Sequence, residues 1–256
     1  MPSGTRPGKD RLDHLLVRQQ LAQSRDVAVR MILAGEVRVN GAVIDKPAKA
    51  VPEDAAIEIT GQSGRFVSRG GEKLAVALEA GSIDPRGLIC LDVGCSTGGF
   101  TDCLLQRGAE RVYAVDVGYG QFDWRLRRDP RVVLIERTNI RTIVRSAIPE
   151  PIALAVIDVS FISLTKVLPA VIVFLSPDAR VIALVKPQFE VGKGQVGRGG
   201  IVRDETRRQE ALQRVLRFAA GLGLRAKQTV DSPLKGKKGN REILALFEFP
   251  ASFHDM

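Results

Sequence analysis

The residue types and spacing best suited to binding a ligand lie in a glycine-rich segment, Asp92-Val93-Gly94-Cys95-Ser96-Thr97-Gly98-Gly99-Phe100. Glycines let a backbone fold tightly around a ligand, and the helix expected after this segment offers unpaired N–H groups to polar atoms. A dinucleotide loop of the form G-x-G-x-x-G needs a glycine where this chain has Ser96. The next strand-like segment ends at Asp116, where a carboxylate can hold a ribose diol.

Two lysines and two carboxylates stand where expected strands or helices begin or end. Lys186 ends the segment "IALVK" and Asp158 ends "LAVID", so their side chains should converge at one edge of a parallel sheet. Lys73 lies at the start of a helical pattern in "SRGGEKL", and Glu242 opens the last strand in "GNREILALFE". Such groups can orient a hydroxyl and remove its proton during attack on an electrophile. A plain ion pair for Lys186 and Asp158, and solvated charges for the other two, are the alternative interpretations.

The segments "LDVGCSTGGFTD" and "VYAVDVG" resemble the S-adenosylmethionine loop of Rossmann-like methyltransferases. The resemblance implies S-adenosylmethionine as cofactor and contacts to it from Asp92, Gly94, Ser96, Gly98, Gly99, Phe100 and Asp116. The alternative is a glycine turn that only packs a helix on a strand. A second glycine pattern, Gly192–Gly197, fits G-x-G-x-x-G letter for letter, but no strand immediately precedes it, and we interpret it as a mobile loop.

The residues at the end of the expected fourth strand indicate which type of atom accepts the methyl group. Amine methyltransferases typically carry D/N-P-P-Y/F there, whereas this chain has "DVSF", without prolines. A cytosine-carbon enzyme needs a cysteine nucleophile, but Cys90, Cys95 and Cys103 lie in or beside the cofactor strand and its helix. The chain has two histidines, both near its ends, so acid–base work falls to Asp, Glu or Lys. A hydroxyl is therefore the preferred acceptor.

Strand-like and helical segments alternate over residues 67–250, which predicts an α/β fold with a mostly parallel sheet covered on both faces. We expect a Rossmann-like methyltransferase sheet with an antiparallel last strand. The strands are expected at residues 89–91, 112–115, 132–135, 153–157, 181–185, 224–230 and 242–249, and the helices at 71–80, 99–107, 163–174 and 203–220.

Residues 9–60 form a different pattern, and residues 61–66 are expected to be a linker. Two short helices, the second capped by Ser24, precede a hairpin that turns at Asn40-Gly41 and a further short strand at 57–59. This small α+β module resembles the S-four-type RNA-binding fold. The resemblance implies contacts to the backbone of structured RNA from Arg11, Arg18, Arg25, Arg30 and Arg38.

Charge and composition narrow the class of protein. The formal net charge is +9, concentrated in residues 1–50 and 186–245, which favours a polyanionic partner touched in two places. The longest apolar runs are far shorter than the roughly 20 residues of a membrane span. The three cysteines form no C-x-x-C pair, so we expect a cytoplasmic protein without a metal site.

Lys73, Asp158, Lys186 and Glu242 resemble the tetrad of ribose 2′-O-methyltransferases of the FtsJ (RrmJ-like) type. With the RNA-binding module in front, residues 9–250 resemble the TlyA family, often labelled hemolysin A. The resemblance implies ribosomal RNA or ribosomal subunits as partner and the 2′-hydroxyls of cytidines in 16S and/or 23S RNA as acceptors. Lys186 would contact the 2′-oxygen, as base or as the group that aims its lone pair. Asp158 would hold Lys186, and Lys73 and Glu242 would complete the polar ring.

Two other classes of protein stay open at this point. A catalytically inactive RNA-binding or ribosome-assembly protein would keep the basic module, but has no need of Asp92, Asp116 and the tetrad together. A membrane-active hemolysin is suggested by the family label alone. The sequence argues against it, because no lone helix has a broad apolar face. The sequence leaves the modified nucleotide, the subunit and the oligomeric state open.

Overall fold

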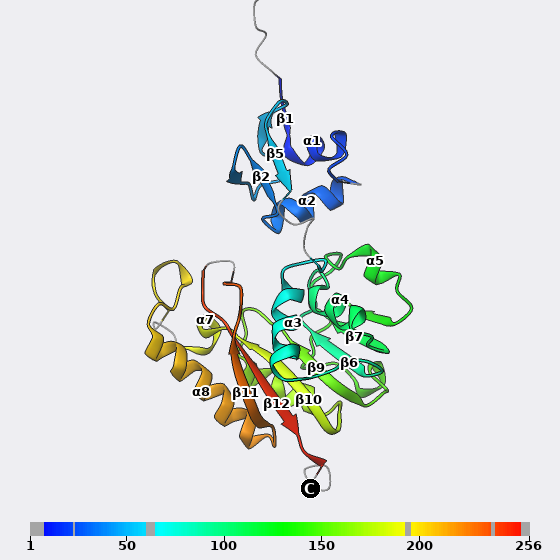
Figure 1. The fold of residues 1–256 in the computed structure, drawn as a ribbon, viewed down its shortest axis with the longest axis vertical. Helices are drawn as coiled ribbons and strands as arrows, with labels where there is room; N and C mark the ends of the chain where they lie inside the picture. Colours follow the sequence, from blue (N-terminus) through cyan, green and yellow to red (C-terminus); the bar gives the residue numbers. More distant parts are fainter. Residues whose placement is uncertain (1–7, 23, 60–64, 193–195, 237–238, 252–256) are drawn as a thin grey trace, which may run out of the picture. The chain divides into compact units, whose positions relative to one another are not determined.

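A computed structural model describes residues 8–22, 24–59, 65–192, 196–236 and 239–251. The chain divides into two compact units, Met1–Gly64 and Arg65–Met256. Figure 1 shows the elements of both, and each unit is described by itself. Most of the predicted linker, and residues 193–195 of the predicted mobile loop, lie outside the described residues. Phe66 already belongs to the core of the second unit, where it is buried.

The N-terminal unit packs two short helices on small antiparallel sheets. The Ser24 hydroxyl caps the second helix by accepting from the backbone N–H of Val27 at 3.3 Å. Asn40 and Gly41 both have positive φ angles, as a tight hairpin turn requires. The elements are β1 (Lys9–Arg11), α1 (Leu12–Arg18), α2 (Arg25–Leu33), β2 (Val37–Val39), β3 (Ala42–Val43), β4 (Ala50–Pro52) and β5 (Ile57–Ile59), paired as β3-β2-β5 and β1-β4.

The second unit is built on a seven-stranded sheet with the order β11-β12-β10-β9-β6-β7-β8. Neighbouring strands from β10 to β8 are parallel, and β12 is antiparallel to both β10 and β11, between which it runs in Figure 1. The predicted fold class is confirmed, including the antiparallel last strand. The strands are β6 (Ile89–Val93), β7 (Arg111–Val115), β8 (Val132–Ile135), β9 (Ile152–Ile157), β10 (Leu175–Val185), β11 (Arg225–Asp231) and β12 (Ile243–Phe249).

Helices cover both faces of this sheet, because successive strand residues point to opposite sides. Cys90 of β6 belongs to the hydrophobic cluster under α3 and α4, whereas its neighbour Leu91 belongs to the cluster under α6 and α8. The helices and helical turns are α3 (Gly70–Ala80), α4 (Gly99–Gln106), α5 (Trp124–Arg127), η1 (Arg145–Ala147), η2 (Leu164–Lys166), α6 (Leu168–Ile172), α7 (Pro187–Glu190), η3 (Arg198–Gly200) and α8 (Glu205–Gly221).

Two predicted elements differ from the observed ones. The helix predicted over residues 163–174 is two short pieces, η2 and α6, because Pro169 lies in the first turn of α6 and has no N–H to continue the earlier turn. The strand predicted over residues 181–185 begins earlier, at Leu175, with a register shift against β9 before Arg180. The short β1 and β4 strands, which pair with each other, were not expected.

Gly71 of α3 provides a test of this packing. A Cβ there would overlap the side chain of the buried Phe66 close to its own Cβ, where the ring cannot swing away. We therefore expect Gly71→Ala to lower the free energy of unfolding by about 1–3 kcal/mol. Gly221→Ala, at a helical glycine with nothing within 4 Å, is the control. It should leave stability unchanged or raise it by up to about 1 kcal/mol. Urea unfolding of the two variants measures the difference, and equal effects would contradict the packing.

Candidate active site

The register of the sheet gathers the predicted catalytic residues at one edge. Asp158 follows the last residue of β9, and its N–H donates to Val93 O of β6 at 2.9 Å. Lys186 directly follows β10, and Glu242 directly precedes β12. Val185 of β10 pairs with Ile243 of β12, so Lys186 and Glu242 come next to each other in that antiparallel register.

Lys186 is held by two groups on the loop after β9. Its Nζ lies 2.6 Å from Asp158 Oδ1 and donates to Ser160 Oγ at 2.9 Å. The side chains of Lys186 and Asp158 are 12% and 24% exposed, so the pair is largely shielded but open to a ligand. The contact with Asp158 Oδ1 is an ion pair without a hydrogen bond, and Ser160 accepts one of the three N–H donors of the ammonium group, so donors remain for a ligand.

Lys73 and Glu242 form a second ion pair between α3 and the start of β12. The Lys73 Nζ lies 2.6 Å from Glu242 Oε2, and the Glu242 side chain is 3% exposed. A carboxylate buried to this degree needs a partner, because desolvation of the charge is otherwise costly. The four predicted residues are therefore two lysine–carboxylate pairs, each joining different elements.

The glycine-rich loop lies directly beside Asp158. Gly94 has a φ of +86°, and a Cβ there would meet the Asp158 carbonyl oxygen at 2.5 Å. Gly98 precedes α4 with a φ of +94°, and its N–H donates to Cys95 O at 2.7 Å. Positive φ favours glycine at both positions, and a Cβ is excluded at Gly94 by the Asp158 carbonyl and at Gly98 by the Leu126 side chain, which it would meet at 2.5 Å. Gly99 begins α4, and a Cβ there would overlap Ser68 Oγ.

Asp116 ties the end of β7 to the glycine-rich loop. Its Oδ2 accepts from the Ser96 N–H at 2.8 Å, and its Oδ1 accepts from the Gly118 N–H at 2.6 Å. Ser96 has a positive φ and an exposed side chain, and Phe100 is buried in the first turn of α4. Each oxygen of Asp116 keeps a lone pair for a further donor, such as a hydroxyl of a ribose.

Asp92 is a fully buried carboxylate next to the loop. Its Oδ2 accepts from the Thr101 hydroxyl at 2.7 Å, while Oδ1 has no hydrogen-bond partner among the described residues. Burial raises the pKa of Asp92 to about 7; Thr101 opposes the rise, and the nearby Asp158 charge adds to it. A cofactor with amino and hydroxyl donors fits this acceptor-rich loop.

All three cysteines are buried and carry raised pKa values. Burial raises the pKa of Cys90 to about 12 and of Cys103 to about 11, and also raises that of Cys95. A thiolate is the nucleophilic form of cysteine. None of the three is therefore suited to nucleophilic catalysis, as the sequence predicted.

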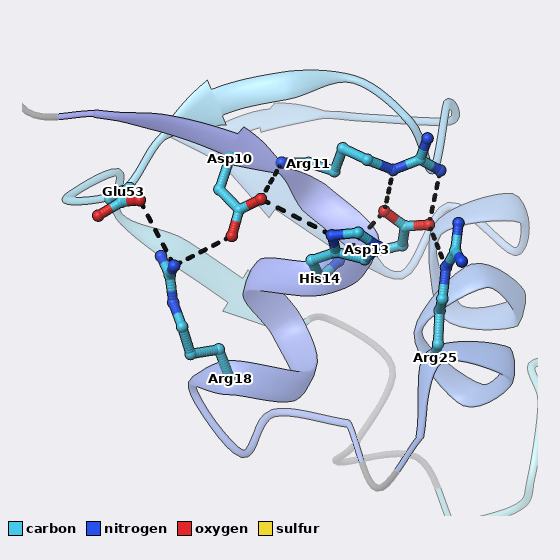
Figure 2. A network of polar contacts seen from close by, with 7 residues as sticks. All are labelled: Asp10, Arg11, Asp13, His14, Arg18, Arg25 and Glu53. Carbon is cyan, nitrogen blue, oxygen red and sulfur yellow. Dashed lines mark hydrogen bonds and ion pairs between the residues drawn. The ribbon is translucent and has the colours of Figure 1, made fainter.

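The predicted RNA-binding arginines have different surroundings in the N-terminal unit (Figure 2). Arg11 and Arg25 bind the same carboxylate, Asp13, with Nε-to-oxygen distances of 2.9 and 3.0 Å. Arg18 binds Asp10 at 3.1 Å and Glu53 at 3.4 Å. Of the two arginines that Figure 2 does not label, Arg38 donates to Gly41 O at 3.0 Å and Arg30 is half-buried on α2.

Sequence reasoning assigned no role to three residues that hold these groups. Ser160 binds Lys186, Thr101 binds Asp92 and Asp13 binds two arginines. Ser160 stands two residues after Asp158 and Thr101 follows the glycine loop, so their positions were a usable signal. No usable signal in the sequence pointed to Asp13, because its partner Arg25 lies on the other helix.

Two kinds of feature are absent from the described residues. No group of three or more His, Cys, Asp or Glu side chains could hold a metal ion. Within the same residues, no helix is long and apolar enough to cross a membrane.

Residues 66–249 match the family described as FtsJ-like methyltransferase, and residues 10–57 match the S4 domain. The 16S/23S rRNA (cytidine-2′-O)-methyltransferase TlyA of Mycobacterium tuberculosis is 52% identical over 91% of this chain and 87% of its own length. The chain belongs to the TlyA family of FtsJ-like methyltransferases. The predicted enzyme class and S-adenosylmethionine as its cofactor are thereby confirmed.

Other relatives of this TlyA-family chain carry a different label. Hemolysin A of Brachyspira hyodysenteriae is 42% identical over 93% of this chain and 99% of its own length. A solved structure from Streptococcus thermophilus, described as a candidate hemolysin, matches with a TM-score of 0.75 and 42% identity, and covers 95% of this chain and 89% of that one. The family label in the sequence prediction is therefore confirmed.

The buried Asp92 should make stability depend on pH. Its pKa is raised in the folded protein, so the fold binds this proton more tightly, and stability falls as pH rises from about 3.8 to about 7. Asp92→Asn should remove this fall, and the variant should gain stability relative to wild type across that window. Urea unfolding without cofactor at a series of pH values measures it. The exposed Asp84, replaced by Asn, is the control. Parallel curves for wild type and Asp92→Asn would contradict the assignment.

Asp116 should contribute to cofactor affinity. Asp116→Ala removes the acceptor of the Ser96 and Gly118 N–H groups and of any ribose hydroxyl. We expect S-adenosylmethionine binding to weaken by roughly 1.5–3 kcal/mol, the range for a hydrogen bond to a charged group. Isothermal titration calorimetry measures the affinity. Asp129→Ala, which removes a carboxylate bound to Arg131, should leave it unchanged. Unchanged affinity in Asp116→Ala would place the cofactor elsewhere.

Proposed function

We propose that this chain methylates the 2′-hydroxyl of cytidines in ribosomal RNA, in the 16S and/or 23S molecule. The observation that carries the proposal is Lys186 Nζ, held by Asp158 and Ser160 at the edge of the sheet where the glycine-rich loop also lies. This places a directed cationic or basic nitrogen beside the loop suited to the methyl donor. The names of relatives, including the Mycobacterium tuberculosis TlyA, support the same acceptor.

In the proposed reaction a ribose hydroxyl attacks a methyl group in line. A hydroxyl is a poor nucleophile, so the site must orient it and remove its proton. S-adenosylmethionine supplies the electrophilic methyl group when bound, and the loop residues from Asp92 to Phe100, together with Asp116, would hold it. Lys186 would contact the 2′-oxygen and either accept its proton or aim its lone pair. Asp158 and Ser160 would keep Lys186 in place, because a misplacement of about 1 Å can cost on the order of 100-fold in rate.

The second ion pair would complete the site. Lys73 lies on α3, and Glu242 directly precedes β12, where it neighbours Lys186 in the register of the sheet. Their pairing balances charge beside the acceptor, and Lys73 would present its positive charge to the substrate side. Metal ions have no part in this proposal, which assigns the proton chemistry to side chains.

The substrate side of the proposal rests on the N-terminal unit. Its match to the S4 domain and its exposed arginines fit phosphate contacts that position structured RNA without reading its sequence. We propose residues 9–60 as this RNA-binding domain and residues 67–250 as the methyltransferase domain, joined at residues 61–66. Ribosomal RNA or ribosomal subunits would be the partner, and we propose the cytoplasm as the location of the enzyme.

One experiment tests the acceptor directly. Purified protein and S-adenosylmethionine with a labelled methyl group are incubated with protein-free ribosomal RNA, separate subunits and assembled ribosomes. The 2′-O-methyl positions are then mapped. Label on a cytidine 2′-oxygen supports the proposal, label on a base overturns the choice of acceptor, and cofactor binding without any transfer favours an inactive RNA-binding protein.

Lys186 should be essential for methyl transfer. Lys186→Ala removes the nitrogen beside the acceptor, so transfer should be abolished while cofactor affinity stays near wild type. Ser160→Ala should slow transfer by a smaller factor, because Asp158 still holds the lysine. Lys166→Ala, at an exposed lysine of η2, is the control and should keep full activity. Single-turnover transfer of labelled methyl groups measures each variant.

Lys186→Arg separates the two roles of the lysine. Arginine keeps the charge but does not lose a proton and carries a larger planar head. Substantial transfer by Lys186→Arg would assign a steering charge, and loss of transfer would support a base or a strict size requirement. Normal transfer by Lys186→Ala would overturn the proposed acceptor chemistry.

A further inference from the structure

Asp13 is a buried carboxylate that lies between two arginines (Figure 2). Its side chain is 0% exposed, although it belongs to the first turn of α1. Arg11 donates from Nε and Nη2 to the two carboxylate oxygens, both at 2.9 Å, and Arg25 donates from Nε to Oδ2 at 3.0 Å. The His14 N–H donates to Oδ1 at 3.1 Å. Every oxygen of this buried charge is therefore engaged.

The two arginines reach Asp13 from different elements and remain open to solvent. Arg11 ends β1 and Arg25 begins α2, and their side chains are 42% and 58% exposed. A guanidinium has five N–H donors, and Asp13 takes two from Arg11 and one from Arg25. The remaining donors of both arginines are available to an acceptor at the surface.

The charge of this cluster distinguishes it from its neighbour. Two guanidiniums against one carboxylate leave a surplus of one positive charge, and the hydrogen bonds from Arg11 and Arg25 hold the pKa of Asp13 far below its usual range. Asp10 links this cluster to its neighbour, because it accepts from the Arg11 backbone N–H at 2.7 Å, but its side chain does not bind the Arg11 guanidinium. Arg18, in contrast, binds two carboxylates, Asp10 and Glu53, through its guanidinium. The first cluster suits an anion, whereas the second is already neutralised.

We propose that Asp13 is a positioning residue for RNA binding, which holds Arg11 and Arg25 together as a pair that binds one backbone phosphate. Two arginines already fixed in direction lose less side-chain freedom on binding than two free ones. Guanidinium groups also match phosphate oxygens in geometry, so a fixed pair can form several charge-assisted hydrogen bonds at once. This inference rests on the proposed function, in which structured RNA is the substrate.

Removal of the Asp13 charge tests whether this residue positions the arginines, because charge alone and positioning predict opposite effects on RNA affinity. Asp13→Asn raises the net charge by one, so charge alone predicts tighter binding to RNA. If Asp13 positions the arginines, the variant should instead bind protein-free ribosomal RNA roughly 10- to 150-fold more weakly, the loss of about one charge-assisted hydrogen bond. Glu53→Gln is the matched control, because it removes an arginine-bound carboxylate from the same unit, and it should bind as wild type or more tightly.

A double-mutant cycle separates positioning from a loss of folding. In the Arg11→Ala/Arg25→Ala background, a further Asp13→Asn change should alter RNA affinity by less than about twofold, because the groups it acts through are gone. The same change should raise the unfolding temperature in that background, since it removes a buried carboxylate left without a cationic partner. Equal losses of affinity in both backgrounds, or tighter binding by Asp13→Asn, would overturn the proposal.

The salt dependence of binding gives a second readout. The slope of log affinity against log salt decreases in magnitude by about 0.7–0.9 for each phosphate that the protein no longer neutralises. Asp13→Asn should therefore reduce the slope by at most about the value for one phosphate, and a larger drop would indicate general unfolding of the unit and overturn the proposal.

Binding is measured without cofactor. Failure of the wild-type protein to bind RNA would overturn the proposed function, whereas equal binding by wild type and Asp13→Asn would overturn only the role of Asp13.

Discussion

The close approach of Gly94 to the Asp158 main chain is the constraint on which the site depends. A Cβ at Gly94 would lie 2.5 Å from the Asp158 carbonyl oxygen, so only glycine lets the loop after β6 pass the end of β9. This contact puts the loop proposed to bind the methyl donor beside the strand end that carries the carboxylate partner of Lys186. The parallel pairing of β6 with β9 maintains it, because Val93 and Ile157 share a register.

Paired charges organise both units in the same physical way. Glu242 and Asp13 are buried carboxylates, and each is compensated by cations from another element or from the adjoining turn. Since breaking such a pair leaves an uncompensated buried charge, the cations are held in direction as well as in place. In one unit the held cation is Lys73, in the proposed active site, and in the other the held cations are arginines at a surface. Rigid positioning of cations therefore connects the proposed chemistry with the proposed RNA binding.

Much of the fold followed from local signals. The period of apolar residues predicted the strands around Leu91, Val156 and Leu246 and the long helix α8, because burial on two sheet faces imposes a recognisable pattern. The prediction of one helix across Pro169 was wrong. The apolar pattern continues through this residue, but proline has no N–H to continue the backbone hydrogen bonds of a helix. The strand pair β1–β4 was missed, since pairing across forty residues leaves no trace in either short segment.

The sequence by itself determined the chemistry available: a glycine loop, two acids at strand ends, two lysines and a set of arginines. Which of these meet was decided only by the tertiary structure. Lys73 and Glu242 are 169 positions apart and pair at 2.6 Å, because α3 packs near β12. Asp13 joins Arg11 to Arg25 because α1 and α2 pack together, a contact that no spacing along the chain encodes. Side-chain partners depend on packing between distant elements, whereas residue types and local periodicity are properties of the chain alone.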